Sequence, residues 1–135
     1  MIAILCLDDR KGMMFNGRRQ SRDRRVVERI LELCEKKTLW IHPYSKCLFE
    51  GREPENIRIE ESFLEKAGKG EYCLVENQGL AKFQAHLEGI VVFWWNRRYP
   101  GDFCLDLNLK LWKKIETEDF VGFSHEKVTR EVYVK

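Results

Sequence analysis

The sequence predicts an α/β protein: a mixed sheet with helices on both faces and an antiparallel hairpin at the C-terminal end. Two apolar runs, Ile2–Leu7 and Ile90–Trp95, show no polar alternation, which is typical of strands covered on both faces. Near the end of the chain, Leu109–Phe120 and Lys127–Lys135 are two successive strand candidates with no helix between them. Because strands and helices alternate before this pair, the pattern favours a three-layer α/β fold whose first strand is central.

The first helix is predicted directly after a basic stretch. Ser21 can cap it, since a serine side chain accepts hydrogen bonds from the free N–H groups of a first turn. Apolar residues then recur at helical spacing, at Val26, Val27, Ile30, Leu31 and Cys34. A short strand is expected at 38–41, and Pro43 ends it.

The middle of the chain predicts two strands and two helices. Residues 57–60 and 72–75 have the alternating or apolar composition of strands. Ser62–Glu65 has the spacing of a capping box, and Asn77 can cap a later helix that carries Leu80, Phe83 and Leu87. Glycines follow both helices, as is typical of helix ends.

Length and charge limit the classes of protein to consider. At 135 residues we expect one domain, 1–135, and the net charge of +2 gives no global attraction to nucleic acid or membrane. No apolar run reaches the roughly 18 residues of a membrane span, and the N-terminal run is too short for a signal peptide. Five scattered cysteines match neither a disulfide framework nor a zinc site, so we expect reduced thiols in a cytoplasmic protein. Nothing indicates the oligomeric state.

One local feature could bind an anion. Five arginines are candidate phosphate or anion ligands: Arg18, Arg19, Arg22, Arg24 and Arg25. A solvated loop and helix face with local ion pairs is the favoured interpretation of the same residues. Asp23 lies in the first helical turn, where the helix dipole favours a carboxylate without any catalytic role. The three histidines share no metal-ligand spacing, so no metal is expected.

Taken in order, these segments resemble the dihydrofolate reductase family over nearly the whole chain. "IAILCLDDRKGMMFNG" is similar to that family's opening strand and mobile active-site loop, with Asp8, Gly12, Met13 and Gly17 in corresponding places. "YPGDFCLDL", "LWKKIE" and "VTREVYV" resemble its Gly-Asp turn, Trp-bearing strand and final antiparallel strand. The resemblance implies a dihydrofolate reductase-like fold and, where the chemistry is kept, an NADPH-dependent reductase of a pterin-like or other small heterocyclic substrate.

The departures from the family concern its catalytic and cofactor positions. Asp23 matches the family's proton-donating carboxylate only if three or four residues are deleted. "HPYSK", from His42 to Lys46, replaces residues that help to hold the NADPH phosphates. In the segment "VENQG", Glu76 and Asn77 stand in place of the Gly-Gly pair that lets backbone approach the pyrophosphate, and Gln78 and Gly79 belong to the same former cofactor site. The chain also resembles a shortened member between Ile41 and Ile57.

These departures give three hypotheses. The leading one is a dihydrofolate reductase-like protein that has lost NADPH chemistry, needs no cofactor, and acts as an interaction domain or binds a small anionic ligand through the five arginines. The second is an active NADPH-dependent reductase with Asp23 as proton donor and Lys46 or Arg52 as a new phosphate anchor. The third, a lesser alternative, is nucleic-acid or nucleotide binding, including phosphodiester cleavage, by the arginine cluster. Because Glu76 would repel a pyrophosphate, it counts against the second.

Overall fold

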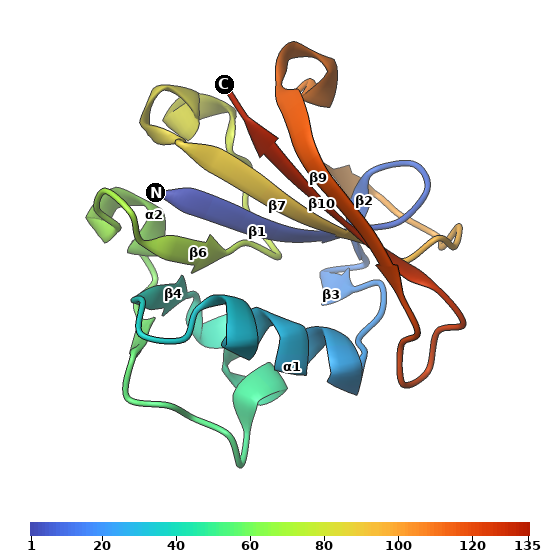
Figure 1. Ribbon diagram of the computed structural model, residues 1–135, viewed down its shortest axis with the longest axis horizontal. Helices are drawn as coiled ribbons and strands as arrows, with labels where there is room; N and C mark the ends of the chain where they lie inside the picture. Colours follow the sequence, from blue (N-terminus) through green and yellow to red (C-terminus); the bar gives the residue numbers. More distant parts are fainter.

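A computed structural model describes residues 1–135 and contains a seven-stranded sheet in the order β5–β4–β6–β1–β7–β10–β9 (Figure 1). The strands are β1 (Ile2–Leu7), β4 (Leu39–Ile41), β5 (Ile57–Ile59), β6 (Tyr72–Leu74), β7 (Gly89–Trp94), β9 (Lys113–Phe120) and β10 (Val128–Val134). The first five in this order run parallel, and β10 is antiparallel to both β7 and β9. The predicted mixed sheet, its central first strand and its C-terminal hairpin are confirmed.

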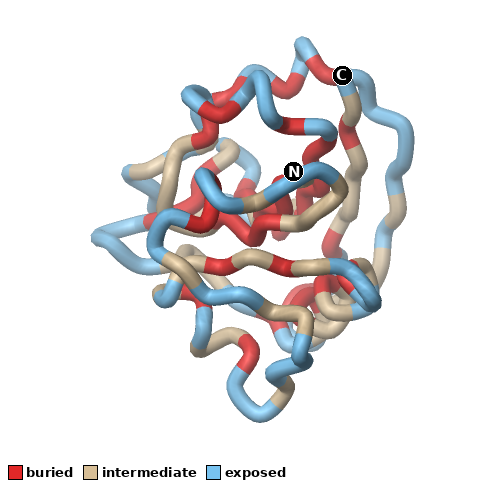
Figure 2. The backbone as a smooth tube through the Cα atoms, turned by 90° about the vertical axis from the view of Figure 1, so that its left-hand side faces the viewer, coloured by how far each residue is buried: buried red, intermediate tan, exposed pale blue.

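Each face of the sheet has its own apolar core. Along β1, Ala3, Leu5 and Leu7 face one core and Ile4 faces the other, because successive side chains of a strand point to opposite sides. Two helices, α1 (Arg24–Leu33) and η1 (Pro43–Phe49), cover the Ile4 side. The opposite side is covered by α2 (Phe63–Lys66), η2 (Ala81–His86) and η3 (Leu109–Leu111). Buried residues therefore concentrate along the strands in Figure 2, between the two outer layers.

The helix ends differ from the predicted ones. Asp23, rather than Ser21, caps α1, and its carboxylate accepts hydrogen bonds from the Arg25 and Val26 N–H groups. Ser62 makes no capping hydrogen bond to α2. Asn77 caps no helix: the chain bends at residues 76–78, and η2 starts only at Ala81. At the start of α1, both N–H groups donate to Asp23 Oδ1, while Oδ2 accepts from Ser124 N–H and His125, a second role that a serine hydroxyl does not fill.

The first strand of the C-terminal hairpin is shorter than predicted. Residues 109–111, which were expected to begin it, form η3 instead, and β9 starts at Lys113. Asn108 explains the change, since its side chain accepts a hydrogen bond from Lys110 N–H and starts a helical turn.

The segment expected to be a mobile active-site loop forms a β-hairpin. β2 (Gly12–Phe15) pairs with β3 (Arg18–Arg19) and with β8 (Phe103–Cys104) in a separate three-stranded sheet. Asn16 and Gly17 join the first two strands with φ angles of 51° and 72°. Two successive positive φ angles define the turn that suits a two-residue hairpin, and Asn-Gly is its strongest sequence signal. The Asn-Gly pair in "MFNGRR" is therefore the sequence signal that predicts this hairpin.

The five cysteines are free and differ sharply in exposure. Burial raises the pKa of Cys34 and of Cys73 to about 12, whereas Cys104 lies exposed on β8. Since the thiolate is the reactive form, iodoacetamide should alkylate Cys104 at least about 100-fold faster than either buried thiol in the native protein. Mass spectrometry of the non-reduced, alkylated protein shows the order in which the cysteines are alkylated. Two or more intramolecular disulfides, or equal rates at these three cysteines, would contradict it.

None of the helices is long and apolar enough to cross a membrane.

Candidate functional site

The candidate site lies at the carboxyl ends of β4 and β6, where ligands usually bind in open α/β sheets. Glu76 follows β6 directly after Val75, and η1 follows β4. Two chain segments that are distant in sequence therefore meet here, and the β2–β3 hairpin joins them from the side through Arg19.

An ion pair between Arg19 and Glu76 fills this crevice. Arg19 Nε donates to Glu76 Oε2 at 2.9 Å and Arg19 Nη2 donates to Oε1 at 3.0 Å, so the pairing is bidentate. The hydroxyl of Ser45 donates a third hydrogen bond to Glu76 Oε1 at 2.7 Å. The two charged side chains are only 16% and 10% exposed. Such short, charge-assisted and shielded bonds hold both groups in place.

Arg19 also fixes the hairpin to η1. Its guanidinium lies 4.5 Å from the centre of the Tyr44 ring, and its backbone N–H donates to the Tyr44 hydroxyl at 2.8 Å. Burial opposes the charge of Arg19, but the hydrogen bond and charge of Glu76 outweigh it and raise the pKa of Arg19 above its usual value. The arginine is therefore a fixed cation committed to this chain's own carboxylate.

The residues after Glu76 leave little room at the start of η2. A Cβ at Gly79 would lie 2.5 Å from Asp106 Oδ2, so any other residue there would force that carboxylate to move. Asp106 Oδ1 accepts hydrogen bonds from Leu80 N–H at 2.8 Å and from Ala81 N–H at 3.1 Å. Asn77 Oδ1 is buried without a hydrogen-bond partner, and Gln78 is half-buried. The N–H groups that could hold a phosphate thus already hold an internal anion.

Gly12 and Met13 belong to the base of the hairpin. The buried carboxylate of Asp8 accepts hydrogen bonds from Gly12 N–H at 2.7 Å and from Gln20 Nε2 at 3.1 Å. A Cβ at Gly12 would lie 2.5 Å from Gln20 Nε2, and Met13 is buried in the core. These positions therefore support the hairpin and do not face an open cleft.

Asp23 is buried and fully occupied by hydrogen bonds. Besides capping α1, its carboxylate accepts from Phe123 N–H at 3.0 Å, from Ser124 N–H at 2.8 Å and from His125 Nδ1 at 2.9 Å. Burial raises the pKa of Asp23, but the hydrogen bonds from His125 and the backbone outweigh this effect and lower it below the usual carboxyl value. Asp23 is thus an ionised structural anchor in this arrangement, while proton donation from it stays a prediction.

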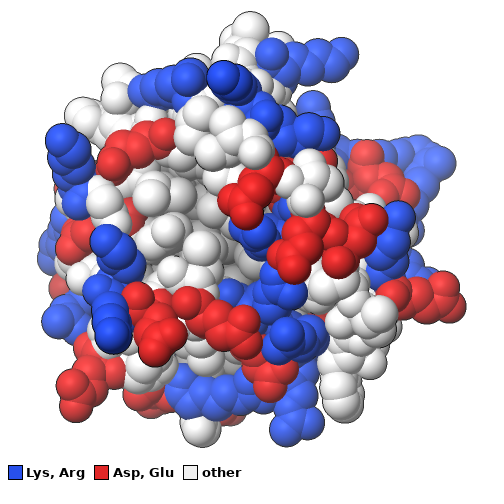
Figure 3. Space-filling view, viewed as in Figure 1, with Lys and Arg blue, Asp and Glu red and all other residues white.

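The arginine cluster is dispersed. Arg25 pairs with Glu28 and Glu32 on its own helix, and Arg24 lies over the ring of Phe123 at 5.5 Å. Arg18 and Arg22 are exposed and make no ion pair. On the face shown in Figure 3, cations and anions are interspersed. Nucleic-acid binding therefore has no single continuous cationic surface to support it here and stays a prediction.

His42 and Lys46, which were also predicted to belong to the former cofactor site, both lie on or beside η1. The ring of His42 caps η1, accepting from Tyr44 N–H at Nδ1 over 3.0 Å, and Lys46 is exposed on the same helix. No group of three or more His, Cys, Asp or Glu side chains is arranged to hold a metal ion.

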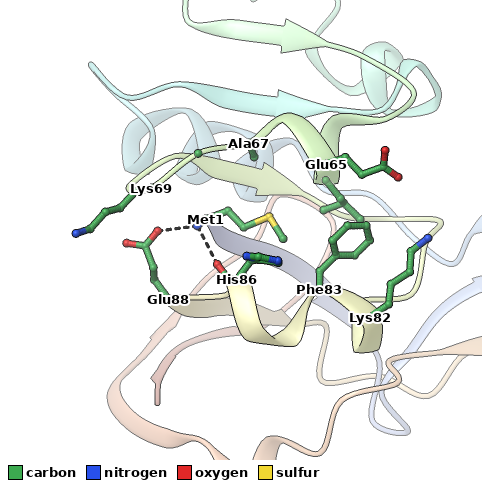
Figure 4. Close-up of a pocket in the computed structure, with 10 residues that line it drawn as sticks. Met1, Glu65, Ala67, Lys69, Lys82, Phe83, His86 and Glu88 are labelled. Carbon is green, nitrogen blue, oxygen red and sulfur yellow. Dashed lines mark hydrogen bonds and ion pairs between the residues drawn. The ribbon is translucent and has the colours of Figure 1, made fainter.

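The hollows in the surface differ in size and place. A cavity of only about 20 Å³, room for about one water molecule, lies beside Asp23 and Glu76. A pocket of about 460 Å³ opens beside the hairpin, at Arg18, Gln20 and Tyr99. The largest, about 700 Å³, lies at the opposite ends of the strands, where Phe83 and His86 of η2 face the α2 side across Met1 (Figure 4).

A structural comparison decides the fold. The chain is similar to a dihydrofolate reductase from Enterococcus faecalis complexed with NADP(H) and RAB-propyl, with a TM-score of 0.69, 14% sequence identity, and coverage of 98% of this chain and 94% of that one. The fold is that of dihydrofolate reductase. No family model matches the sequence, and no curated protein matches it either.

Between Ile41 and Ile57 the chain resembles a shortened member of the dihydrofolate reductase family. The alignment spans nearly all of both chains, and η1 is the one helix between β4 and β5. In this dihydrofolate reductase-like fold, the crevice at β4 and β6 is the place that the sequence resemblance gives to NADPH, and Arg19 and Glu76 occupy it. Sequence reasoning identified both residues but did not pair them, because they are 57 residues apart.

Proposed function

We propose that this dihydrofolate reductase-like protein has lost NADPH-dependent reduction and works as a binding domain for a small anion, in a reducing, cytoplasmic setting. The observation that carries the loss is the bidentate Arg19–Glu76 pair with its third hydrogen bond from Ser45. A pyrophosphate entering the crevice would meet the Glu76 carboxylate and would have to separate a shielded ion pair, which costs several kcal/mol.

Two further observations support the loss. The N–H groups of Leu80 and Ala81, which begin η2, are taken by Asp106, so a phosphate would have to displace an anion already attached to the chain. Asp23, the candidate proton donor, accepts hydrogen bonds at both carboxylate oxygens and has a lowered pKa. A carboxylic acid that donates protons near neutral pH needs the opposite shift.

The binding role that we propose uses the pocket beside the hairpin. Arg18 lines it without an ion pair and is the cation that we propose to hold the anion. A thermal-shift titration with inorganic phosphate and with small carboxylates tests this role, because a ligand at about a hundredfold over its Kd stabilises a protein by roughly 2.7 kcal/mol. Arg18→Ala should remove the shift, whereas Lys46→Ala, which changes an exposed cation outside the pocket, should keep it.

Isothermal titration with NADPH tests the proposed loss of NADPH binding. The wild-type protein should bind NADPH with a Kd above about 1 mM, or give no measurable heat. The double substitution Glu76→Gly with Asn77→Gly should bind at least about tenfold more tightly, since it removes the repelling charge and frees the Arg19 guanidinium for a phosphate.

A matched control separates these two effects. Adding Arg19→Met to the double-glycine variant should abolish the gain if the freed guanidinium holds the phosphate. Low-micromolar binding of NADPH by the wild type, with oxidation of NADPH in the presence of a pterin, would overturn the proposal and support the active-reductase hypothesis, with Asp23 as the first residue to replace.

A further inference from the structure

A serine, a histidine and an aspartate are aligned beside α1. His125 Nε2 lies 3.0 Å from Ser21 Oγ, and His125 Nδ1 lies 2.9 Å from Asp23 Oδ2. Both distances are within hydrogen-bond reach of a nucleophile, its base and the group that orients the base. The resemblance to dihydrofolate reductase implies nothing of this kind, and Ser21 and His125 are 104 residues apart in the sequence.

The tautomer of His125 follows from the surroundings of Asp23. Every other polar contact of this carboxylate is a donor: the Arg25, Val26, Phe123 and Ser124 N–H groups and the Ser124 hydroxyl. Because an ionised carboxylate only accepts, His125 must present a proton at Nδ1. The lone pair of the neutral ring is then on Nε2, which faces the Ser21 hydroxyl. This is the proton arrangement of a serine triad.

The imidazole is rigidly held, and the serine is only partly exposed. His125 is 5% exposed and stacks on Trp95 with ring centres 4.6 Å apart. Ser21 is half-buried and lines the one-water cavity together with Arg22, Cys6 and Glu76. Arg22 makes no ion pair, and Glu76 is neutralised by Arg19. Arg22 is therefore a cation without a counter-charge among the residues that line the same cavity as Ser21.

We propose that Ser21, His125 and Asp23 form an acyl-transfer site for small esters that approach Ser21 from solvent, because the cavity beside it has room for only about one water molecule. Ser21 Oγ attacks the ester carbonyl while His125 Nε2 takes the hydroxyl proton, and the oxyanion forms beside Arg22. Collapse breaks the bond to the leaving alcohol, which receives the proton from His125 and leaves the acyl group on Ser21. A water molecule, deprotonated by His125, then attacks the acyl-serine and restores the hydroxyl. The products are the carboxylic acid and the alcohol, so ester and water balance.

A second hydroxyl competes for the same lone pair. Tyr99 OH also lies 3.0 Å from His125 Nε2, and one lone pair cannot accept fully from two donors at once. Tyr99→Phe removes the competitor and leaves the ring in place. Ser21 should therefore become about two- to tenfold more reactive in this variant, a change that a purely structural hydrogen-bond network does not produce.

The test is covalent labelling of the intact protein by a small fluorophosphonate, followed by mass spectrometry, with hydrolysis of p-nitrophenyl acetate as the second readout. One adduct should form, on Ser21. Ser21→Ala should abolish the adduct, and His125→Gln should slow it about 100-fold or more. Ser62→Ala, at an exposed serine without side-chain hydrogen bonds, is the matched control and should label like wild type.

A variant that does not fold cannot test the site, so folding is measured before labelling. Circular dichroism first shows that each variant is folded, and Ser21→Ala is the decisive one if His125→Gln unfolds. No adduct on the wild type, an adduct elsewhere, or labelling that survives Ser21→Ala would overturn the acyl-transfer site. None of these outcomes depends on whether NADPH or an anion binds.

Discussion

Replacing Asp23 by alanine is expected to lower the free energy of unfolding by about 3–5 kcal/mol, one of the two largest effects of any polar substitution in this fold. The carboxylate is buried and ties the start of α1 to the loop before β10. Its removal leaves two helix N–H groups uncapped and takes away the acceptor of the partly buried Phe123 and Ser124 N–H groups and of the buried His125 ring. Each buried donor without a partner costs about 1–3 kcal/mol, so the sum is large even after partial relaxation.

Urea denaturation of the variant and the wild type measures this loss. Asp23→Asn is a matched variant of the same size: it keeps one acceptor but turns an amide donor toward other donors, so it should cost about 2–4 kcal/mol. Asp9→Ala removes an exposed carboxylate one turn before the hairpin and should change stability by less than about 0.5 kcal/mol. A loss below about 1 kcal/mol for Asp23→Ala would contradict the anchoring role.

The same carboxylate should make the protein sensitive to acid. Because the pKa of Asp23 is lower in the folded state than its ordinary value of 3.8, folding favours the ionised form. Its contribution is therefore complete above that ordinary value and is lost as the pH falls below it. Urea midpoints should drop more steeply for wild type than for Asp23→Asn between about pH 5 and pH 2.5. Parallel curves would show that other carboxylates cause the acid sensitivity.

The sheet was predictable because its signals are local. Strands such as β1 and β7 are covered on both faces, so nearly all their residues are apolar and no tertiary information is needed to recognise them. Helix ends were less predictable, since the choice between Ser21 and Asp23 as cap depends on donors from residues 123–125, a hundred positions away. η2 was predicted as a regular helix for the same reason: its first N–H groups are held by Asp106, which the local pattern does not include.

The candidate site was predicted residue by residue but not as an arrangement. Glu76 was expected to repel a pyrophosphate, and the structure shows what balances its charge: Arg19, from the hairpin. That contact depends on the Asn16–Gly17 turn, which sets the register that puts Arg19 opposite Met14. The sequence shows only how many basic residues lie close together along the chain. In the fold, Arg19 and Arg25 form ion pairs with carboxylates, whereas Arg18 and Arg22 form none.

The second large effect is expected from breaking the Arg19–Glu76 pair. Arg19→Met leaves a carboxylate that is 10% exposed with only Ser45 as a partner, and Glu76→Gln leaves a guanidinium that is 16% exposed without a counter-charge. Each single substitution should lower the free energy of unfolding by about 2–4 kcal/mol, because removal of one partner leaves a shielded charge uncompensated.

The double variant is the informative one. Removing both charges together avoids the uncompensated state, so Arg19→Met with Glu76→Gln should cost no more than the worse single substitution and give a coupling energy of about 2–3 kcal/mol. The exposed pair Lys127–Asp119, with side chains 62% and 54% exposed, is the control and should couple by less than about 0.5 kcal/mol. Additive costs at Arg19 and Glu76 would mean that the pair does not hold the crevice closed, and the case against NADPH would then rest on Asp106 alone. Strong coupling would instead show that this ion pair fastens the hairpin across the crevice in addition to the Arg19–Tyr44 contacts, so that a cofactor could enter only by separating both charges.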